Sequence, residues 1–259
     1  MLSLIKNIQL FLPAFVLIFL RLTAMFISMP IFGYYTLNPR LRVLLAFCFT
    51  LILFPSIGKH SIIFNSTGSL VLAGVQEVFL GLLIGFGTRL VFESFNMAGV
   101  IMAQQMGYSM ANILDPTSGE QQPTVSQFWF LLLLVFFLTM NAHFFLIEVM
   151  IKNFQLLPLN VTKVQTAAGE QLMRGGTLTF ELSLKIAAPV FMLLLVLDAA
   201  IALIARVMPQ MNVFFVTLPL KIGVGLLAIV SSLNVFQSLF AIFFDEVRRF
   251  VEGLLIRLT

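Results

Sequence analysis

Few side chains in this sequence could carry out acid–base, nucleophilic or metal chemistry. The 259 residues include two histidines, His60 and His143, and one cysteine, Cys48. A catalytic triad or a multi-thiolate metal site needs more of these groups than the chain supplies. Two carboxylates, Glu77 and Asp198, lie in apolar segments, but neither has an identifiable catalytic partner in the sequence. We therefore predict a protein that is not an enzyme and that needs no cofactor and no metal ion.

The composition is that of an integral membrane protein. The chain is 60% hydrophobic and only 10% charged, and its mean hydropathy is +1.05, whereas about 25% of the residues of a soluble domain are charged. The net charge of +4 comes from basic residues scattered along the chain. Because they form no basic stripe, we expect no nucleic-acid partner. We predict a single membrane domain, residues 1–259, in contact with lipid.

Six apolar segments follow one another along the chain, and most reach the ~20 residues that a transmembrane helix needs. They are Ile8–Phe32, Leu41–Ile57, Leu70–Phe92, Phe128–Ile147, Leu178–Ala205 and Gly223–Phe244. The tail after the last segment alternates charged and apolar residues, as an amphipathic helix at a membrane surface would. We therefore predict an all-α membrane protein of about six helical segments.

Polar side chains within these segments indicate where a helix faces protein rather than lipid. Arg21 interrupts the first segment, Gln76 and Glu77 lie in the third, and Asp198 lies deep in the fifth. A charged side chain at the centre of a bilayer is costly and is expected to pair or to face a polar interior. By the same argument we expect Lys221 to lie against a protein carboxylate or against carbonyl groups of a partner.

Small residues in the third segment predict a close helix contact. Gly81 and Gly85 have the GxxxG spacing that lets two helices approach closely in lipid. Nearby, Arg89 and Glu93 are four residues apart and can form an ion pair on one face of a helix. We interpret the glycines as a helix-packing surface and the ion pair as structural.

A methionine face precedes the most polar stretch of the chain. Met102, Met106 and Met110 are spaced four apart, which places them on one side of a helix, one turn after another. Methionine is unbranched and adaptable, so such a face can seal against varied surfaces and yield when a chain passes.

The segment that follows is irregular and polar. Gly107 costs roughly 1 kcal/mol relative to alanine if the helix continues through it. The Asp115-Pro116 pair, shortly after Asn112, is expected to stop the helix, since a residue before proline is driven out of the helical region. Such backbone is tolerated at membrane depth only where protein buries it or where it lines a watery space. From composition alone, residues 107–123 are either such an internal loop or an ordinary loop outside the membrane.

Several short motifs together resemble one known family along nearly the whole chain. They are Val75-Gln76-Glu77, the run from Gly81 to Gly85, Ala98-Gly99 with Gln104, Met106 and Gly107, Asp115-Pro116, PQMNVF from Pro209 to Phe214, and LPLK from Leu218 to Lys221. In this order and spacing they resemble the FliR family of flagellar export-gate proteins, whose relatives serve type III virulence secretion. The run from Pro209 to Lys221 is the most specific part.

The resemblance implies a subunit of a flagellar protein-export channel in the bacterial inner membrane, at the flagellar basal body. It implies tilted helical hairpins, a FliP-like part over 1–177, a FliQ-like part over 178–259 and a plug loop at about 107–123. The implied partners are FliP-like and FliQ-like subunits, other export-gate components and exported polypeptides. The candidate partner contacts are the buried polar residues Gln76, Glu77 and Asp198 together with Pro209, Gln210, Asn212, Pro219 and Lys221.

Two other functions compete with this interpretation. A stand-alone transporter of a small solute or ion would need polar groups at a repeat interface, but no inverted repeat is evident in the sequence. An intramembrane enzyme would need a base close to a nucleophile. Co-purification with other small hydrophobic proteins separates an export subunit from both alternatives.

Overall fold

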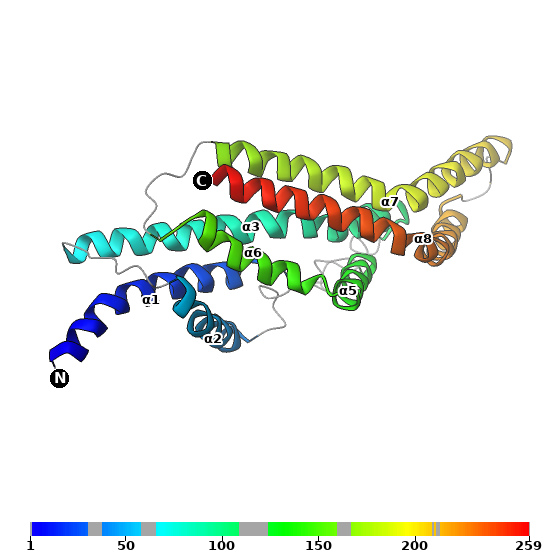
Figure 1. Ribbon diagram of the computed structural model, residues 1–259. Helices are drawn as coiled ribbons and strands as arrows, with labels where there is room; N and C mark the ends of the chain where they lie inside the picture. The colour runs from blue at the N-terminus through cyan, green and yellow to red at the C-terminus, as the bar shows by residue number, and fades with distance from the viewer. Residues whose placement is uncertain are drawn as a thin grey trace. The chain divides into compact units, whose positions relative to one another are not determined.

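The computed structural model describes residues 2–30, 38–57, 66–108, 124–159, 167–208, 210 and 213–258. Within these ranges the chain is helical and contains no strand (Figure 1). The helices are α1 (Leu2–Ser28), α2 (Pro39–Ile57), α3 (Thr67–Gln105), α5 (Thr124–Thr139), α6 (His143–Leu156), α7 (Ala167–Val207) and α8 (Val213–Leu258). The predicted all-α fold is confirmed for this part of the chain.

Among the described residues, five helices are long and apolar enough to cross a membrane, and the pair α5–α6 makes a sixth if it counts as one broken span. Large apolar side chains are also exposed. Ile52 on α2, Val196 on α7 and Leu227 on α8 each have an exposed fraction of 70%. Lipid chains can cover such side chains without loss, because they are as apolar as the side chains themselves. The prediction of a membrane protein with about six helical segments is confirmed.

Two segment boundaries differ from the prediction. α3 is one helix of 39 residues that continues past Phe92 to Gln105, so Met102 lies on the same helix as the GxxxG pair. The single helix expected over 128–147 is instead interrupted between α5 and α6, where Asn141 has a φ of 56°. Asparagine adopts this left-handed conformation more readily than most residues, which lets the chain break its helix there.

Pro189 and Pro219 lie inside the last two helices and do not end them. α7 runs through Pro189 and α8 runs through Pro219. α8 begins at Val213, so the last segment starts earlier than the predicted Gly223. In apolar helices the backbone groups that proline frees can be satisfied by small local adjustments and by neighbouring helices.

The chain divides into two compact units. Unit 1 contains residues 1–91, 142–176 and 247–259, and unit 2 contains residues 92–141 and 177–246. Helices α1, α2 and α6 lie in unit 1 and α5 lies in unit 2, while α3, α7 and α8 contribute to both.

In unit 1, aromatic side chains join α1 to α2. The ring centroid of Phe15 lies 5.9 Å from that of Phe47 and 5.6 Å from that of Phe54, with the rings edge to face. Such pairs contribute about 0.5–1.5 kcal/mol beyond the area they bury. They hold α2 on one side of α1 and leave the opposite side of α2 exposed.

The end of α8 also packs within unit 1. Leu254 lies against Gly87 of α3, and a Cβ atom at Gly175 of α7 would lie 2.6 Å from the Phe250 ring. Leu254 is fully buried. The predicted amphipathic tail at the membrane surface is therefore wrong, because the apolar side of this segment is covered by the protein's own helices.

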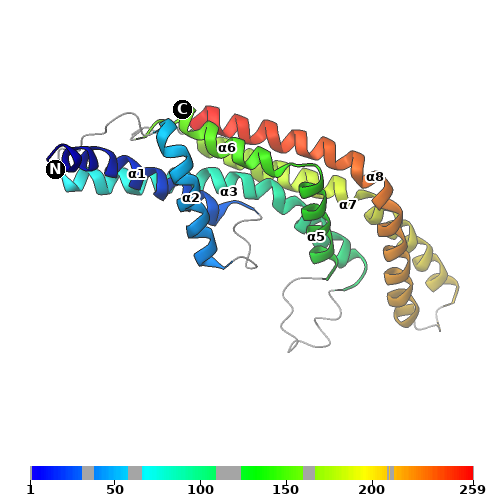
Figure 2. The ribbon, with the colours of Figure 1, turned by 60° about the horizontal axis from the view of Figure 1, so that its bottom comes forward.

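In unit 2, an aromatic cluster joins α3, α5 and α8. The Phe95 ring centroid lies 4.4 Å from that of Phe243 and 5.7 Å from that of Phe236. Trp129 and Phe136 of α5 lie 5.0 and 5.1 Å from Phe236. The unit 2 parts of α7 and α8 run side by side as a hairpin (Figure 2).

Candidate functional site

Unit 1 contains a charged centre that solvent does not reach. Arg21 of α1 donates from Nε to Glu77 Oε2 of α3, and the side chains have exposed fractions of 0% and 1%. Arg21 Nη1 donates to Asn153 Oδ1 at 3.1 Å and to the Leu157 carbonyl oxygen at 2.7 Å. The Phe154 ring centroid lies 4.7 Å from the Arg21 Cζ atom. One guanidinium thus joins α1 to α3 and to the carboxyl end of α6.

This geometry explains how two charged residues persist in apolar helices. A buried ion pair is tolerated when further hydrogen bonds satisfy the charged groups, and arginine offers five donors in a rigid plane. Arg21 Nη2 is buried and has no hydrogen-bond partner within the described ranges. The sequence left Arg21 and Glu77 without identified partners. They are 56 residues apart, a separation that no helical spacing predicts.

Gly81 and Gly85 pack against α1 next to this ion pair. A Cβ atom at Gly81 would overlap the Arg21 carbonyl oxygen and lie 2.8 Å from Ala24 Cβ, and one at Gly85 would overlap the Ser28 hydroxyl. The GxxxG spacing therefore brings two helices of the same chain close together. This close approach is what places Arg21 within reach of α3.

Unit 2 contains a second charged centre, on the α7–α8 hairpin. Lys221 Nζ lies 2.6 Å from Asp198 Oδ1, with exposed fractions of 17% and 35% for the two side chains. Gln105 Nε2 at the end of α3 donates to Asp198 Oδ2 at 3.1 Å. Asp198 of α7 is thus the carboxylate partner of Lys221 within the same chain. Its carboxylate contacts side chains from α3 and α8.

The end of α3 is closed by a defined backbone motif. Gly107 has a φ of 88°, the left-handed conformation that glycine adopts without a steric cost. Its N–H donates to the Gln104 carbonyl at 3.1 Å, and the Tyr108 N–H donates to the Ala103 carbonyl at 3.0 Å. These two bonds are those of a Schellman cap. The helix therefore ends at Gly107, before the Asp115-Pro116 pair at which the sequence predicted its end, so the prediction that one helix continues through Gly107 is wrong.

Met106 of the methionine face packs on α8 of the same chain. Met102 and Met106 are fully buried, and a Cβ atom at Gly225 of α8 would lie 2.7 Å from Met106 Cγ. In this conformation the two side chains lie inside unit 2 and are not exposed. Met110, the third residue of the face, lies outside the described residues.

The remaining candidate residues fall into two groups. Those outside the described residues are Asn112, Asp115, Pro116, Pro209 and Asn212, in addition to Met110. Those within the described residues are Gln76, half-buried on α3, Gln210, exposed between α7 and α8, and Pro219, exposed on α8. These three side chains all have surface that lipid or a neighbouring protein can contact.

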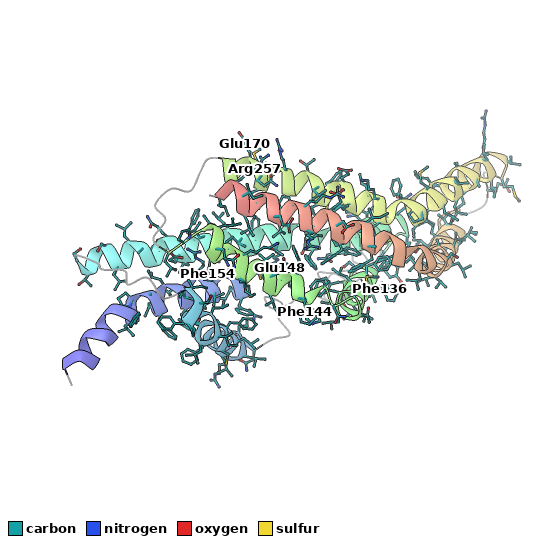
Figure 3. All side chains as sticks on the ribbon, in the orientation of Figure 1. Phe136, Phe144, Glu148, Phe154, Glu170 and Arg257 are labelled. Atoms are coloured by element: carbon teal, nitrogen blue, oxygen red, sulfur yellow. The ribbon has the colours of Figure 1, made fainter. Side chains whose placement is uncertain are left out.

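Four charged side chains that the sequence analysis did not single out form a network in unit 1. Lys152 Nζ lies 2.8 Å from Glu148 Oε1 and 3.4 Å from Glu252 Oε1. Arg248 lies 3.7 Å from Glu148 and 3.5 Å from Glu252. Figure 3 shows Glu148 on α6. The spacing within each helix is visible in the sequence, but the pairing of α6 with α8 is not. Because all four are 39–49% exposed, each pair contributes about 0–1 kcal/mol.

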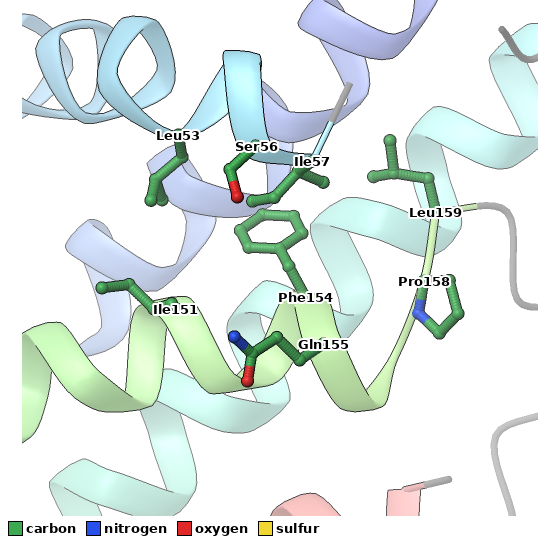
Figure 4. A pocket seen from close by; sticks show the side chains of 8 residues that line it. All are labelled: Leu53, Ser56, Ile57, Ile151, Phe154, Gln155, Pro158 and Leu159. Atoms are coloured by element: carbon green, nitrogen blue, oxygen red, sulfur yellow. The ribbon is translucent and has the colours of Figure 1, made fainter. Parts of the chain in front are cut away.

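Two pockets are lined without any charged side chain. One, of about 320 Å³ in unit 1, is lined by Leu53, Ser56, Ile57, Ile151, Phe154, Gln155, Pro158 and Leu159 (Figure 4). The other, of about 300 Å³ in unit 2, is lined by Tyr108, Thr124, Val125, Phe128, Leu226, Ile229 and Val230. Among the described residues there is no group of three histidine, cysteine or acidic side chains that could hold a metal ion. None of the charged residues of the two charged centres lines either pocket.

Long apolar helices joined by ion pairs define an all-α integral membrane protein. Residues 12–247 match a family described as bacterial export proteins, family 1, and the chain belongs to that family. It is 32% identical over 228 residues to the flagellar biosynthetic protein FliR of Bacillus subtilis, covering 86% of this chain and 87% of that protein. It is 32% identical over 207 residues to FliR of Escherichia coli, covering 80% and 79%, and 31% identical over 219 residues to FliR of Caulobacter vibrioides, covering 84% and 87%.

Proposed function

We propose that this chain is a subunit of the flagellar type III protein-export gate in the bacterial inner membrane, at the flagellar basal body. It forms part of the channel through which unfolded flagellar proteins cross that membrane. The observation that carries this proposal is the similarity to flagellar biosynthetic proteins over four fifths or more of the chain. Its role is structural, since its charged centres serve to join helices.

The proposed partners are FliP-like and FliQ-like membrane subunits. The α7–α8 hairpin supports this proposal because it exposes large apolar side chains, including Val196, Leu203 and Leu227 with exposed fractions of 67–70%. On the same hairpin, Asp198 and Lys221 are partly exposed. A protein neighbour suits such a mixed surface better than lipid, in which exposed charges are costly.

The proposed plug is the polar segment of about residues 107–123. Only Gly107 and Tyr108 of this segment lie within the described residues. Support comes from the composition of the segment, from the resemblance of its flanking motifs to the FliR family, and from the Schellman cap that ends α3 immediately before it. Irregular polar backbone at this point fits the interior of a closed protein channel.

A stand-alone solute transporter is not favoured. A solute site combines a cavity with a few convergent polar or charged groups. The two pockets described above hold no charged side chain, and the ion pairs of the two units do not line them.

Purification in mild detergent tests the proposal. A tagged chain expressed from its own locus should co-purify with a fixed set of other small hydrophobic membrane proteins, which mass spectrometry identifies. Deletion of its gene should abolish export of flagellar proteins and motility. Recovery of the chain alone as a folded protein, together with normal export in the deletion strain, would contradict the proposed function.

A further inference from the structure

The end of α3 is attached to the α7–α8 hairpin by a hydrogen bond and by a packing contact. Gln105 donates a hydrogen bond to Asp198 of α7. Asp198 also pairs with Lys221 of α8. One residue further along α3, Met106 packs into the space that Gly225 of α8 leaves free. All of these residues belong to unit 2.

Asp198 is the residue on which the polar contacts depend. Its two carboxylate oxygens are shared, Oδ1 with Lys221 and Oδ2 with Gln105. The carboxylate therefore links three helices. Because the Gln105 side chain is neutral, its hydrogen bond to Asp198 can form or break while the Asp198–Lys221 ion pair remains.

The Arg21–Glu77 and Asp198–Lys221 ion pairs differ in how accessible they are to other groups. Arg21 and Glu77 are sealed, with exposed fractions of 0% and 1%, and separating them would leave two bare charges in an apolar core. Asp198 and Lys221 keep exposed fractions of 35% and 17%, so other groups can reach and solvate them when the contact opens. The first pair fits a permanent structural role. The partly exposed Asp198 carboxylate can exchange Gln105 for other groups while its ion pair with Lys221 remains.

The local backbone is suited to movement as one piece. The Schellman cap at Gly107 keeps the last turn of α3 closed through its own hydrogen bonds. The last turn therefore does not depend on the hairpin for its hydrogen bonding. Losing the side-chain contacts of Gln105 and Met106 would free the helix end without unfolding it. Methionine suits such a contact because it packs softly on varied surfaces.

We propose that Gln105, Met106, Asp198, Lys221 and Gly225 form a releasable clamp, which holds the end of α3 on the α7–α8 hairpin in the closed state and opens during polypeptide export. This inference rests on the proposed export function. It assigns Gln105 the role of a positioning residue that acts through Asp198, and it makes release of the helix end a required step of each transport event.

A reversible disulfide across the Met106–Gly225 contact tests the clamp. The double variant Met106→Cys/Gly225→Cys is placed in a Cys48→Ser background, because Cys48 is exposed and would form unwanted disulfides. The full export complex is oxidised in cells, and secretion of a flagellar protein is measured before and after a reductant is added. The single variants Met106→Cys and Gly225→Cys, treated in the same way, control for oxidation and for the loss of each native side chain.

If the clamp must open, the disulfide should form in the assembled complex and lower secretion at least tenfold. Adding the reductant should then restore secretion. An assembled, disulfide-linked complex that secretes normally would overturn the inference, and so would failure of the disulfide to form. Neither result affects the proposed function, which co-purification and gene deletion test separately.

Substitutions at Gln105 give a second readout that a purely structural role would not produce. Gln105→Leu and Gln105→Glu lose the hydrogen bond to Asp198, whereas Gln105→Lys keeps a donor there. With equal amounts of assembled complex, ion leak through the resting gate should rise severalfold for Leu, rise further for Glu, and stay near the wild-type level for Lys. Equal leak in all three variants would contradict the clamp.

Discussion

Arg21 and Glu77 form an ion pair from which solvent is excluded, although 56 residues separate them in the sequence. Removing one member leaves an uncompensated buried charge, which typically costs 3–5 kcal/mol. We expect Glu77→Gln or Arg21→Met alone to lower the amount of folded chain in the membrane strongly. The double variant Arg21→Met/Glu77→Met should lower the amount of folded chain by less than the sum of the two single changes. Protease resistance of the membrane-bound chain measures both effects, and simple additivity of the single changes would contradict this prediction.

The packing of Gly81 and Gly85 on α1 predicts a steric effect. A leucine at either position would push α1 away, because a side chain at Gly81 meets the Arg21 backbone and one at Gly85 meets Ser28. Overpacking of this kind costs about 1–3 kcal/mol or more. Gly176→Leu is the matched control, since no atom lies within 4 Å of a Cβ atom there. Protease resistance should fall for Gly81→Leu and Gly85→Leu and stay unchanged for Gly176→Leu.

The left-handed backbone at Gly107 gives a third prediction. Gly107→Ala forces an L side chain into a φ of 88°, at a cost of about 1–2 kcal/mol, and brings its Cβ atom 2.8 Å from Leu218 Cδ2. We expect Gly107→Ala to assemble less efficiently than the wild type and Gly107→Asn to be intermediate, since asparagine tolerates this conformation better. The amount of co-purifying complex is the measurement. Equal yields of all three proteins would show that the cap is not needed for assembly.

Local patterns in the sequence predicted much of the fold. Apolar runs predicted the membrane helices, and the GxxxG spacing predicted a close helix contact. Each of these features acts within a few residues along the chain. By contrast, Pro189 and Pro219 carry a local signal against helix, yet α7 and α8 continue through them.

The partners of the charged residues could not be predicted, because they depend on which helices meet. Arg21 and Glu77 were both noted as costly, yet their pairing needs the tertiary fold. The tail after Phe244 was predicted to lie on the membrane, since its apolar periodicity suits lipid and protein equally well. The packing of Leu254 on Gly87 shows that protein covers the apolar side of this tail.

The Lys221–Asp198 pair predicts an asymmetric response to substitution. Lys221→Ala leaves the carboxylate with only Gln105, whereas Lys221→Arg keeps a cation within reach. We expect Lys221→Ala to reduce assembly or motility severely and Lys221→Arg to reduce them less. Lys185→Ala is the control, since Lys185 is 63% exposed and its pair with Glu181 contributes about 0–1 kcal/mol. A fully motile Lys221→Ala strain would indicate that Lys221 only anchors the helix at the membrane interface.

The last prediction concerns the proposed plug. Residues 110–120 lie outside the described part of the chain, so the prediction rests on their polar composition and on the methionine face before them. We expect deletion of 110–120 to leave the complex assembled but permeable to ions and small solutes. Met102→Ala with Met106→Ala should give a milder leak.

Because both side chains are fully buried, the matched variants Met102→Leu and Met106→Leu keep their volume and control for a packing defect. Small-solute permeability of cells producing the complex is the measurement. Unchanged permeability after the deletion, in an assembled complex, would identify the segment as an ordinary loop and the methionines as ordinary core residues.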